Sequence, residues 1–159
     1  FYCKKKSSGL LEPLSVGGES ADSNKDGKLE YKEMPEKFQA GFRNYVGLAG
    51  MESSISYLQN LGLDNIRKHI IKLSNLFIDE IGKMPESTIY VPKDESVRTS
   101  IVSFDIGKNN PETIVSELAK KGIIIAKREI MDKPILRISP HVFNTEDEIL
   151  KVIEELKKL

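Results

Sequence analysis

Hydrophobic residues return at helical spacing through the middle of the chain. Between positions 41 and 61, apolar side chains recur every three or four residues, and Gly62 follows the last of them. A second apolar stripe begins after Asp64, which we expect to be the N-cap of a long helix ending near Gly82 and Pro85. We therefore predict two consecutive helices whose apolar faces pack in a core. The first stripe comprises Val46, Leu48, Met51, Ile55, Leu58 and Leu61, and the second Ile66, Ile70, Leu73, Phe77 and Ile81.

Runs of β-branched residues alternate with helical patterns in the second half of the chain. One helix is predicted to begin with Asn110 as its N-cap and Pro111 at its first position. Thr145 and Glu148 have the spacing of a capping box at the start of a terminal helix. The order strand, strand, helix, strand, strand, helix predicts a small α+β domain with a mostly antiparallel sheet and its helices on one face. The predicted strands are residues 87–92, 99–107, 122–129 and 134–140.

The first twenty residues show no clear periodicity. We expect the opening FYCKKK to be the end of a strand. The following stretch contains Pro13 and the Gly17-Gly18 pair, which favour a loop. Because the chain begins without methionine, we interpret it as a fragment or a processed product.

Charge and cysteine content narrow the class of protein. The 24 basic and 24 acidic residues cancel, so no long-range field favours nucleic acid or an anionic membrane. The one cysteine, Cys3, excludes an internal disulfide framework and fits a reducing compartment. No apolar run is long enough to span a membrane, and we expect a cytoplasmic protein with neither nucleic acid nor membrane as a partner.

The stretch DSNKDGKLEYKE matches the ligand spacing of an EF-hand loop. Asp22, Asn24, Asp26 and Glu33 occupy positions 1, 3, 5 and 12 of that pattern. An EF-hand also needs a helix on each side of its loop, and prolines and glycines flank this one. A calcium-binding module is therefore kept as an alternative hypothesis, with these four residues as a weak candidate metal site.

Arg137 is the most informative polar residue of the predicted sheet. In the strand Ile135-Leu136-Arg137-Ile138-Ser139, the alternation of faces directs Leu136 and Ile138 away from the arginine side. An arginine held on a strand presents a planar fork that suits two-point binding of a carboxylate. A surface arginine paired with an acidic side chain is the plainer interpretation of the same pattern.

Several separated blocks resemble the class V aminotransferase family. They are residues 35–40, Gly41-Phe42-Arg43-Asn44, the helix through Gly47 and Gly50, and the run from Leu136 to Thr145, all in the family's order. These are pyridoxal-phosphate (PLP) enzymes of fold type I, among them cysteine desulfurases and isopenicillin N epimerase-like proteins.

The resemblance implies an α/β architecture that corresponds to the C-terminal part of such an enzyme. Residues 1–62 would be a remnant of the large PLP-binding domain, with a residual strand and an interface loop. Residues 63–159 would form the small α+β domain after long connecting helices. The segment like FYCKKK follows the Schiff-base lysine in this family, so we expect the N-terminal cofactor domain to be missing. No catalytic residue is then assigned to this chain, which we expect to be inactive alone.

The resemblance also assigns binding roles. Arg137 would hold the α-carboxylate of an amino-acid substrate. The loop containing Phe42, Arg43 and Asn44 would cross a homodimer interface and contact the cofactor phosphate of the other subunit. Phe42 stands where the family commonly has threonine, and the Gly17-Gly18 pair resembles glycines near the partner's active site.

Histidine and cysteine positions complete the expectations. His141 and Asn144 match the last motif of the family, and we interpret them, like His69, as structural. Desulfurases of the family carry a nucleophilic cysteine before the final arginine strand, whereas this chain has none between Gly122 and Arg137. A persulfide-forming desulfurase is therefore disfavoured, and a transaminase, lyase or epimerase acting on an amino acid remains open.

Overall fold

The computed structural model describes residues 2–107 and 109–159 as two compact units. One unit extends to Tyr57, and the other runs from Leu58 to Leu159. The boundary lies inside helix α1 (Tyr45–Leu61). The functional division that the sequence suggested, between residues 62 and 63, stays a prediction.

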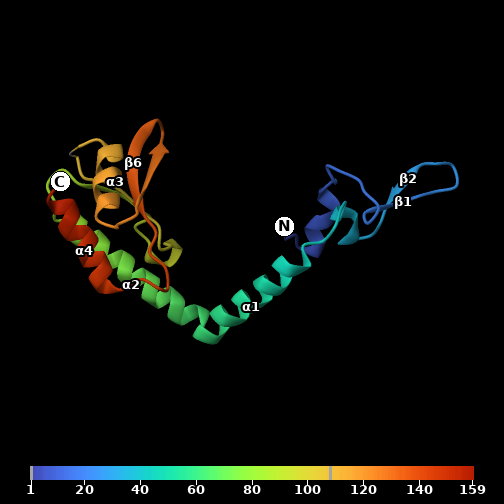
Figure 1. Ribbon diagram of the computed structural model, residues 1–159, viewed down its shortest axis with the longest axis horizontal. Coiled ribbons are helices and arrows are strands. Elements are labelled where there is room, and N and C mark those ends of the chain that lie inside the picture. Colours follow the sequence, from blue (N-terminus) through green and yellow to red (C-terminus); the bar gives the residue numbers. More distant parts are fainter. Residues whose placement is uncertain (1, 108) are drawn as a thin grey trace. The chain divides into compact units, whose positions relative to one another are not determined.

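The N-terminal unit contains short elements ahead of α1 (Figure 1). They are the 3-10 helix η1 (Lys5–Leu10), the antiparallel strands β1 (Ala21–Ser23) and β2 (Leu29–Tyr31), and the 3-10 helix η2 (Glu36–Phe38). The predicted strand end at FYCKKK is wrong in its described part, because Lys5 and Lys6 belong to η1. A strand needs a neighbour for its backbone hydrogen bonds, and no described segment pairs with residues 2–4.

Two consecutive helices follow, as the periodicity predicted. A single residue separates α1 from helix α2 (Leu63–Ile81). Its N-cap is Gly62, with φ at 83°, and not Asp64, which lies in the first turn. Glycine accepts this left-handed backbone without a Cβ clash, so the chain needs one residue for the break. None of the helices in the described residues is long and apolar enough to cross a membrane.

The apolar stripes of the two helices have different environments. In α2, Leu73, Phe77 and Ile81 are buried, as predicted, whereas Ile66 and Ile70 are half-buried. Helix α1 has no buried residue, so its predicted core role is not met within the described chain. Its exposed apolar side chains are Tyr45, Val46, Leu48, Met51, Ile55, Tyr57 and Leu61.

The C-terminal unit has the predicted order of elements after α2. Its four strands form one antiparallel sheet in the order β3-β4-β6-β5. Asn110 caps α3 through its side chain, and Thr145 and Glu148 form the predicted capping box of α4. The elements are β3 (Thr88–Tyr90), the 3-10 helix η3 (Glu95–Val97), β4 (Val102–Asp105), α3 (Pro111–Lys120), β5 (Ala126–Ile130), β6 (Lys133–Ile138) and α4 (Glu146–Lys157).

The core of this unit lies between one face of the sheet and three helices. Phe77 of α2 meets Phe104 of β4 edge to face, with ring centroids 4.9 Å apart. Helix α4 lies alongside α2 (Figure 1), and Leu118 of α3 joins the same cluster. The other core residues include Leu73, Val102, Ile114, Leu136, Ile138, Ile149, Ile153 and Leu156.

Two arginines hold the loop between β3 and β4. Arg67 on α2 donates hydrogen bonds to the carbonyls of Glu95, Ser96 and Arg98, at 2.9–3.0 Å. Arg98 itself donates to the carbonyls of Pro92 and Lys93 and to the Asn75 side chain. The loop is therefore fixed to α2 through its backbone.

The carboxylate of Glu155 connects α4 to its neighbours, and its pH response is measurable. Hydrogen bonds from Lys121 and Lys158 lower the pKa of this carboxyl from 4.5 to about 2. A folded-state pKa below the unfolded value gives a contribution that is present above about pH 4.5 and is lost as pH falls toward 2. In urea denaturation at several pH values, we expect Glu155→Gln to reduce the loss of stability between pH 5 and 2.5.

Glu52→Gln on the exposed surface of α1 is the matched control, since Glu52 has no described ion pair. This variant should follow the wild-type pH curve. Identical curves for Glu155→Gln and wild type would contradict the role given to Glu155.

Candidate functional site

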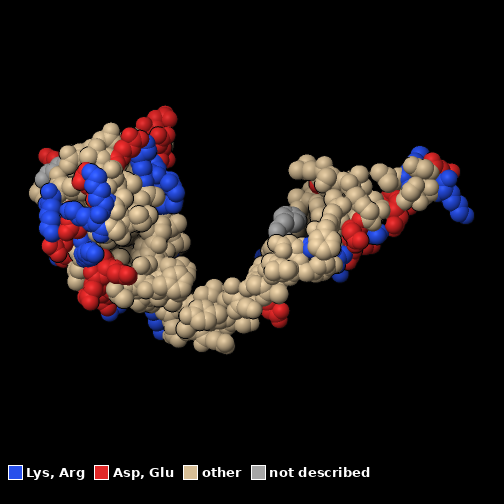
Figure 2. Space-filling model, viewed as in Figure 1, with Lys and Arg blue, Asp and Glu red and all other residues tan. Residues whose placement is uncertain are grey.

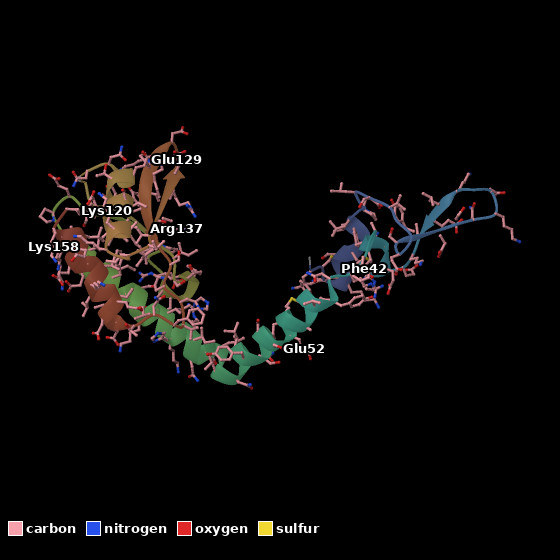
Figure 3. All side chains as sticks on the ribbon, in the orientation of Figure 1. Phe42, Glu52, Lys120, Glu129, Arg137 and Lys158 are labelled. Carbon is pink, nitrogen blue, oxygen red and sulfur yellow. The ribbon has the colours of Figure 1, made fainter. Side chains whose placement is uncertain are left out.

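Arg137 lies on the face of the sheet opposite the helical core. Its neighbours Leu136 and Ile138 are buried in the core, which confirms the alternation predicted for β6. The register places Arg137 opposite Ser103 of β4 on one side and Ala126 of β5 on the other. Figure 3 shows Arg137 on β6.

The guanidinium of Arg137 has an unused donor. Its Nε atom is buried and has no hydrogen-bond partner among residues 2–107 and 109–159. No acidic side chain of the described residues pairs with Arg137, so the plainer prediction of a surface ion pair is not met. A buried donor without a partner loses solvation that a bound anion would restore. The Arg137 Nε–H is therefore a buried donor that no described residue satisfies.

Lys133, on the same face, has partners of its own. Its ammonium group lies 2.9 Å from Asp105 and donates to the Tyr90 hydroxyl at 3.1 Å. Burial raises the pKa of Asp105, but hydrogen bonds from the Gly107 backbone and Lys133 outweigh it and lower the pKa overall. Hydrogen bonds from Lys133 to Asp105 and Tyr90 raise the pKa of Lys133. This cation is therefore neutralised locally.

The N-terminal unit gathers the predicted interface residues at the start of α1. Asn44 accepts a hydrogen bond from the Gly47 backbone at 2.9 Å and so caps the helix. Arg43 makes a long ion pair with Glu19, with 3.7 Å between Nη2 and Oε2. Phe42 (Figure 3) is 94% exposed. Its ring packs edge to face against that of Tyr45, with centroids 5.7 Å apart.

Gly17 explains how this loop packs. A Cβ atom at Gly17 would lie 1.7 Å from the carbonyl oxygen of Ala40, so a side chain does not fit there. Gly18 has open space around its Cα. The first glycine of the pair is needed for close approach to the segment that leads into Phe42.

A two-residue turn joins β5 and β6. Ile130 pairs with Lys133, and the turn residues Met131 and Asp132 have φ values of 49° and 62°. Two positive φ values are typical of the type I′ hairpin turn, which suits the twist of the strands. The family resemblance implies that a desulfurase would carry its nucleophilic cysteine before the arginine strand. In this chain the connection that precedes β6 is a tight turn, and it contains no cysteine.

The calcium-like loop is a β-hairpin. Asp22 lies on β1 and pairs with Lys32 at 3.7 Å, while Asn24 accepts hydrogen bonds from the backbones of Asp26 and Lys28. No group of three or more His, Cys, Asp or Glu side chains in the described residues is arranged to hold a metal ion. The stretch with EF-hand spacing, from Asp22 to Glu33, therefore contains a β-hairpin, and Asn24 stabilises its turn.

The histidines and Asn144 have structural contacts. The Nε2 atom of His69 lies 2.9 Å from the Asn144 carbonyl. The Asn144 side chain accepts from the His141 backbone and donates to Glu148, next to the capping box. The ring of His141 stacks on Phe143. These contacts agree with the structural interpretation of all three residues.

Sequence reasoning missed the neighbours of Arg137 on the open face. Ser103 and Tyr90 pair across adjacent strands, which brings both into one row with Arg137. Alternation assigns a residue to a face, but only strand register shows which residues are opposite one another. No local signal in the sequence gives that register.

Comparison with known proteins identifies the fold and the family. An apo cysteine desulfurase from Thermococcus onnurineus NA1 superposes with a TM-score of 0.87, at 23% identity, over 99% of this chain and 41% of that protein. The cystine C-S lyase C-DES, in complex with its product cysteine persulfide, matches with a TM-score of 0.77, at 21% identity, over 98% of this chain and 40% of its own. The fold is therefore that of part of a fold type I PLP enzyme.

The family follows from the sequence match. The model of the aminotransferase class V family matches residues 1–152, so the chain belongs to that family. Probable cysteine desulfurases from Halalkalibacterium halodurans and Pyrococcus abyssi are 28% and 27% identical over 99% of this chain. The chain spans 40% and 42% of the length of those two relatives.

The geometry of the β1–β2 hairpin predicts no response to calcium. The side-chain amide oxygen of Asn24 accepts hydrogen bonds from the Asp26 and Lys28 backbones, so the turn already uses this oxygen. Millimolar calcium should leave the thermal midpoint and the calorimetric baseline unchanged, both in the wild type and in Asp22→Ala. Heat of binding that disappears in Asp22→Ala would show a real site and overturn this expectation.

Proposed function

We propose that this chain is part of a PLP-dependent enzyme that acts on an amino acid, and that Arg137 binds the substrate's α-carboxylate. One observation carries the proposal. This chain belongs to the class V aminotransferase family, and its Arg137, on the sheet face away from the helices, has a buried Nε atom without a described partner. A guanidinium in that state suits the two oxygens of a carboxylate. Its position on a strand fixes its direction and so orients the bound molecule.

Donors at the start of α1 fit a phosphate group. Arg43 supplies a cation held only by a long contact with Glu19, and the Asn44 amide nitrogen has no described partner. The helix N-terminus adds a favourable dipole for an anion. We propose that Arg43 and Asn44 contact the cofactor phosphate of the partner subunit in a homodimer, while Phe42 contributes packing in place of a hydroxyl.

Pyridoxal 5′-phosphate would supply the electron sink of the reaction. The role of this chain is then to bind and orient: Arg137 aligns the amino acid, and the buried surroundings of its Nε atom keep water away from that bond. The Schiff-base lysine would belong to the missing N-terminal cofactor domain. We therefore expect no turnover by this chain alone, and we place the protein in the cytoplasm because its one cysteine suits a reducing compartment.

The β5–β6 turn bears on the reaction type. A persulfide relay needs a thiolate on a loop that reaches the substrate, and Met131 and Asp132 provide no thiol and little length. We therefore favour a lyase, transaminase or epimerase over a desulfurase that stores sulfur at this position. C-DES is described as a cystine C-S lyase, which agrees with lyase chemistry in a protein of this fold.

Replacing Arg137 tests the proposed function directly. In the complete protein with its cofactor, Arg137→Gln should raise KM for the preferred amino acid roughly 10-fold to 100-fold, because a charge-assisted bidentate bond is lost. Cofactor affinity, measured from its absorbance, should change less than twofold. The substrate is first found by screening the common amino acids for a spectral change.

Lys151→Gln, which removes an exposed positive charge from α4, is the control. It should leave both KM and cofactor affinity unchanged. Equal loss of cofactor and substrate binding in Arg137→Gln would indicate a structural arginine. An unchanged KM would remove the carboxylate role.

The exposed stripe of α1 gives a separate test of the missing domain. We propose that the N-terminal cofactor domain covers the apolar side chains of this helix, because an isolated helix of 17 residues with none buried is marginal in water. Hydrogen exchange of residues 45–57 should be fast in this chain and slowed at least 10-fold in the complete protein. The residues of α2 from Ile71 to Ile81 are the internal reference, since they are protected by the core in both proteins. Equal exchange of α1 in both proteins would contradict the proposal.

A further inference from the structure

We infer that Arg128 is a specificity-determining residue that holds a second anionic group, on the side chain of the amino-acid substrate. This inference rests on the proposed function and extends it from the α-carboxylate to the substrate class. The substrate would be an amino acid with a carboxylate at its distal end.

Strand register places two arginines on the face of the sheet that points away from the helical core, a face on which Ile135 is 1% exposed. Ala126 is opposite Arg137, and Arg128, two residues further along β5, is opposite Ile135. Residues two apart on a strand share a face, so Arg128 is the diagonal neighbour of Arg137. Diagonal neighbours on adjacent strands are roughly 7–8 Å apart at the backbone, within reach of long side chains. Lys127, between Ala126 and Arg128, turns to the other face, where it pairs with Glu112 of α3.

The charges on this face are not balanced. Lys133 is neutralised by Asp105 and also donates to Tyr90. Arg128 is exposed and donates to the backbone of its own neighbour, Lys127, at 2.7 Å. No acidic side chain of the described residues pairs with Arg128 or Arg137. Figure 2 shows basic side chains along the β5–β6 ribbon, with acidic ones gathered at its tip.

Two neighbouring guanidiniums without acids repel each other unless anions lie between them. One carboxylate satisfies Arg137, whose buried Nε favours a fixed, desolvated bond. Arg128 is exposed on the edge strand β5, one strand away from Arg137 on β6, so it suits the second acid of a ligand whose first acid binds Arg137. A molecule with two acids therefore matches the face better than one with a single acid.

The test compares acids with their amides in the complete protein with its cofactor. The probes are α-methyl-L-aspartate against α-methyl-L-asparagine, and α-methyl-L-glutamate against α-methyl-L-glutamine, which lack the α-proton that turnover would remove. Calorimetry gives the ratio of the two Kd values in each pair. For at least one pair, the wild type should bind the acid roughly 10-fold or more tightly than the amide, as expected for a charge-assisted bond.

Arg128→Gln should bring that ratio near one, because it weakens binding of the acid and leaves the Kd of the amide unchanged. Arg128→Lys should keep part of the preference, which shows that the site still folds. Lys127→Gln removes the same charge from the opposite face of the same strand and should keep the wild-type ratio.

The outcomes separate this inference from the proposed function. Arg137→Gln should weaken the binding of acid and amide alike. If it does, and Arg128→Gln leaves the ratio of the two Kd values unchanged, only the role of Arg128 is overturned. A wild-type ratio near one, or equal weakening of acid and amide by Arg128→Gln, would also overturn it. Absence of binding by any probe to the wild type would overturn both proposals.

Discussion

The pleat of β6 decides which of its side chains face the helical core and which face away from it. Leu136 and Ile138 must face the helices to complete the core, and this requirement turns Arg137 to the other side. A slip of one residue would bury the guanidinium and expose the two aliphatic side chains together. Stability and the proposed binding role of Arg137 thus depend on the same register, because a slip that exposed Leu136 and Ile138 would cost core burial.

The hairpin between β5 and β6 links that register to the edge strand. Because the turn has two residues, Ile130 pairs with Lys133, and the pairing of every residue further down the ribbon is fixed. A slip of one residue in the pairing of β5 with β6 would move Arg128 to the face that Lys127 now occupies. The short connection therefore does two things: it leaves no room for a reactive loop, and it sets which cations of β5 share a face with Arg137.

Local signals in the sequence predicted local structure well. The Asn110-Pro111 start of α3 and the Thr145–Glu148 capping box are confirmed, because both depend on contacts within one helical turn. Asp64 was the wrong N-cap, since the break between α1 and α2 depends on a single glycine conformation.

Features that depend on distant partners were beyond sequence patterns. FYCKKK was expected to be extended, but its described residues have no strand beside them. The α1 stripe has the period of a core helix, yet the described residues bury none of it. The face of Arg137 followed from alternation, whereas its neighbours Ser103 and Ala126 required the register of three strands.

The backbone path of the loop between β3 and β4 depends mainly on contacts to its carbonyl oxygens. Arg67 and Arg98 hold it through carbonyl oxygens, which every residue type possesses. The side chain of Lys93 can then diverge during evolution while the backbone path persists, provided that the two arginines remain, whereas the Glu95 carboxylate adds a contact to Asn75 of α2. A segment anchored in this way is a suitable place to introduce new surface chemistry without disturbing the sheet.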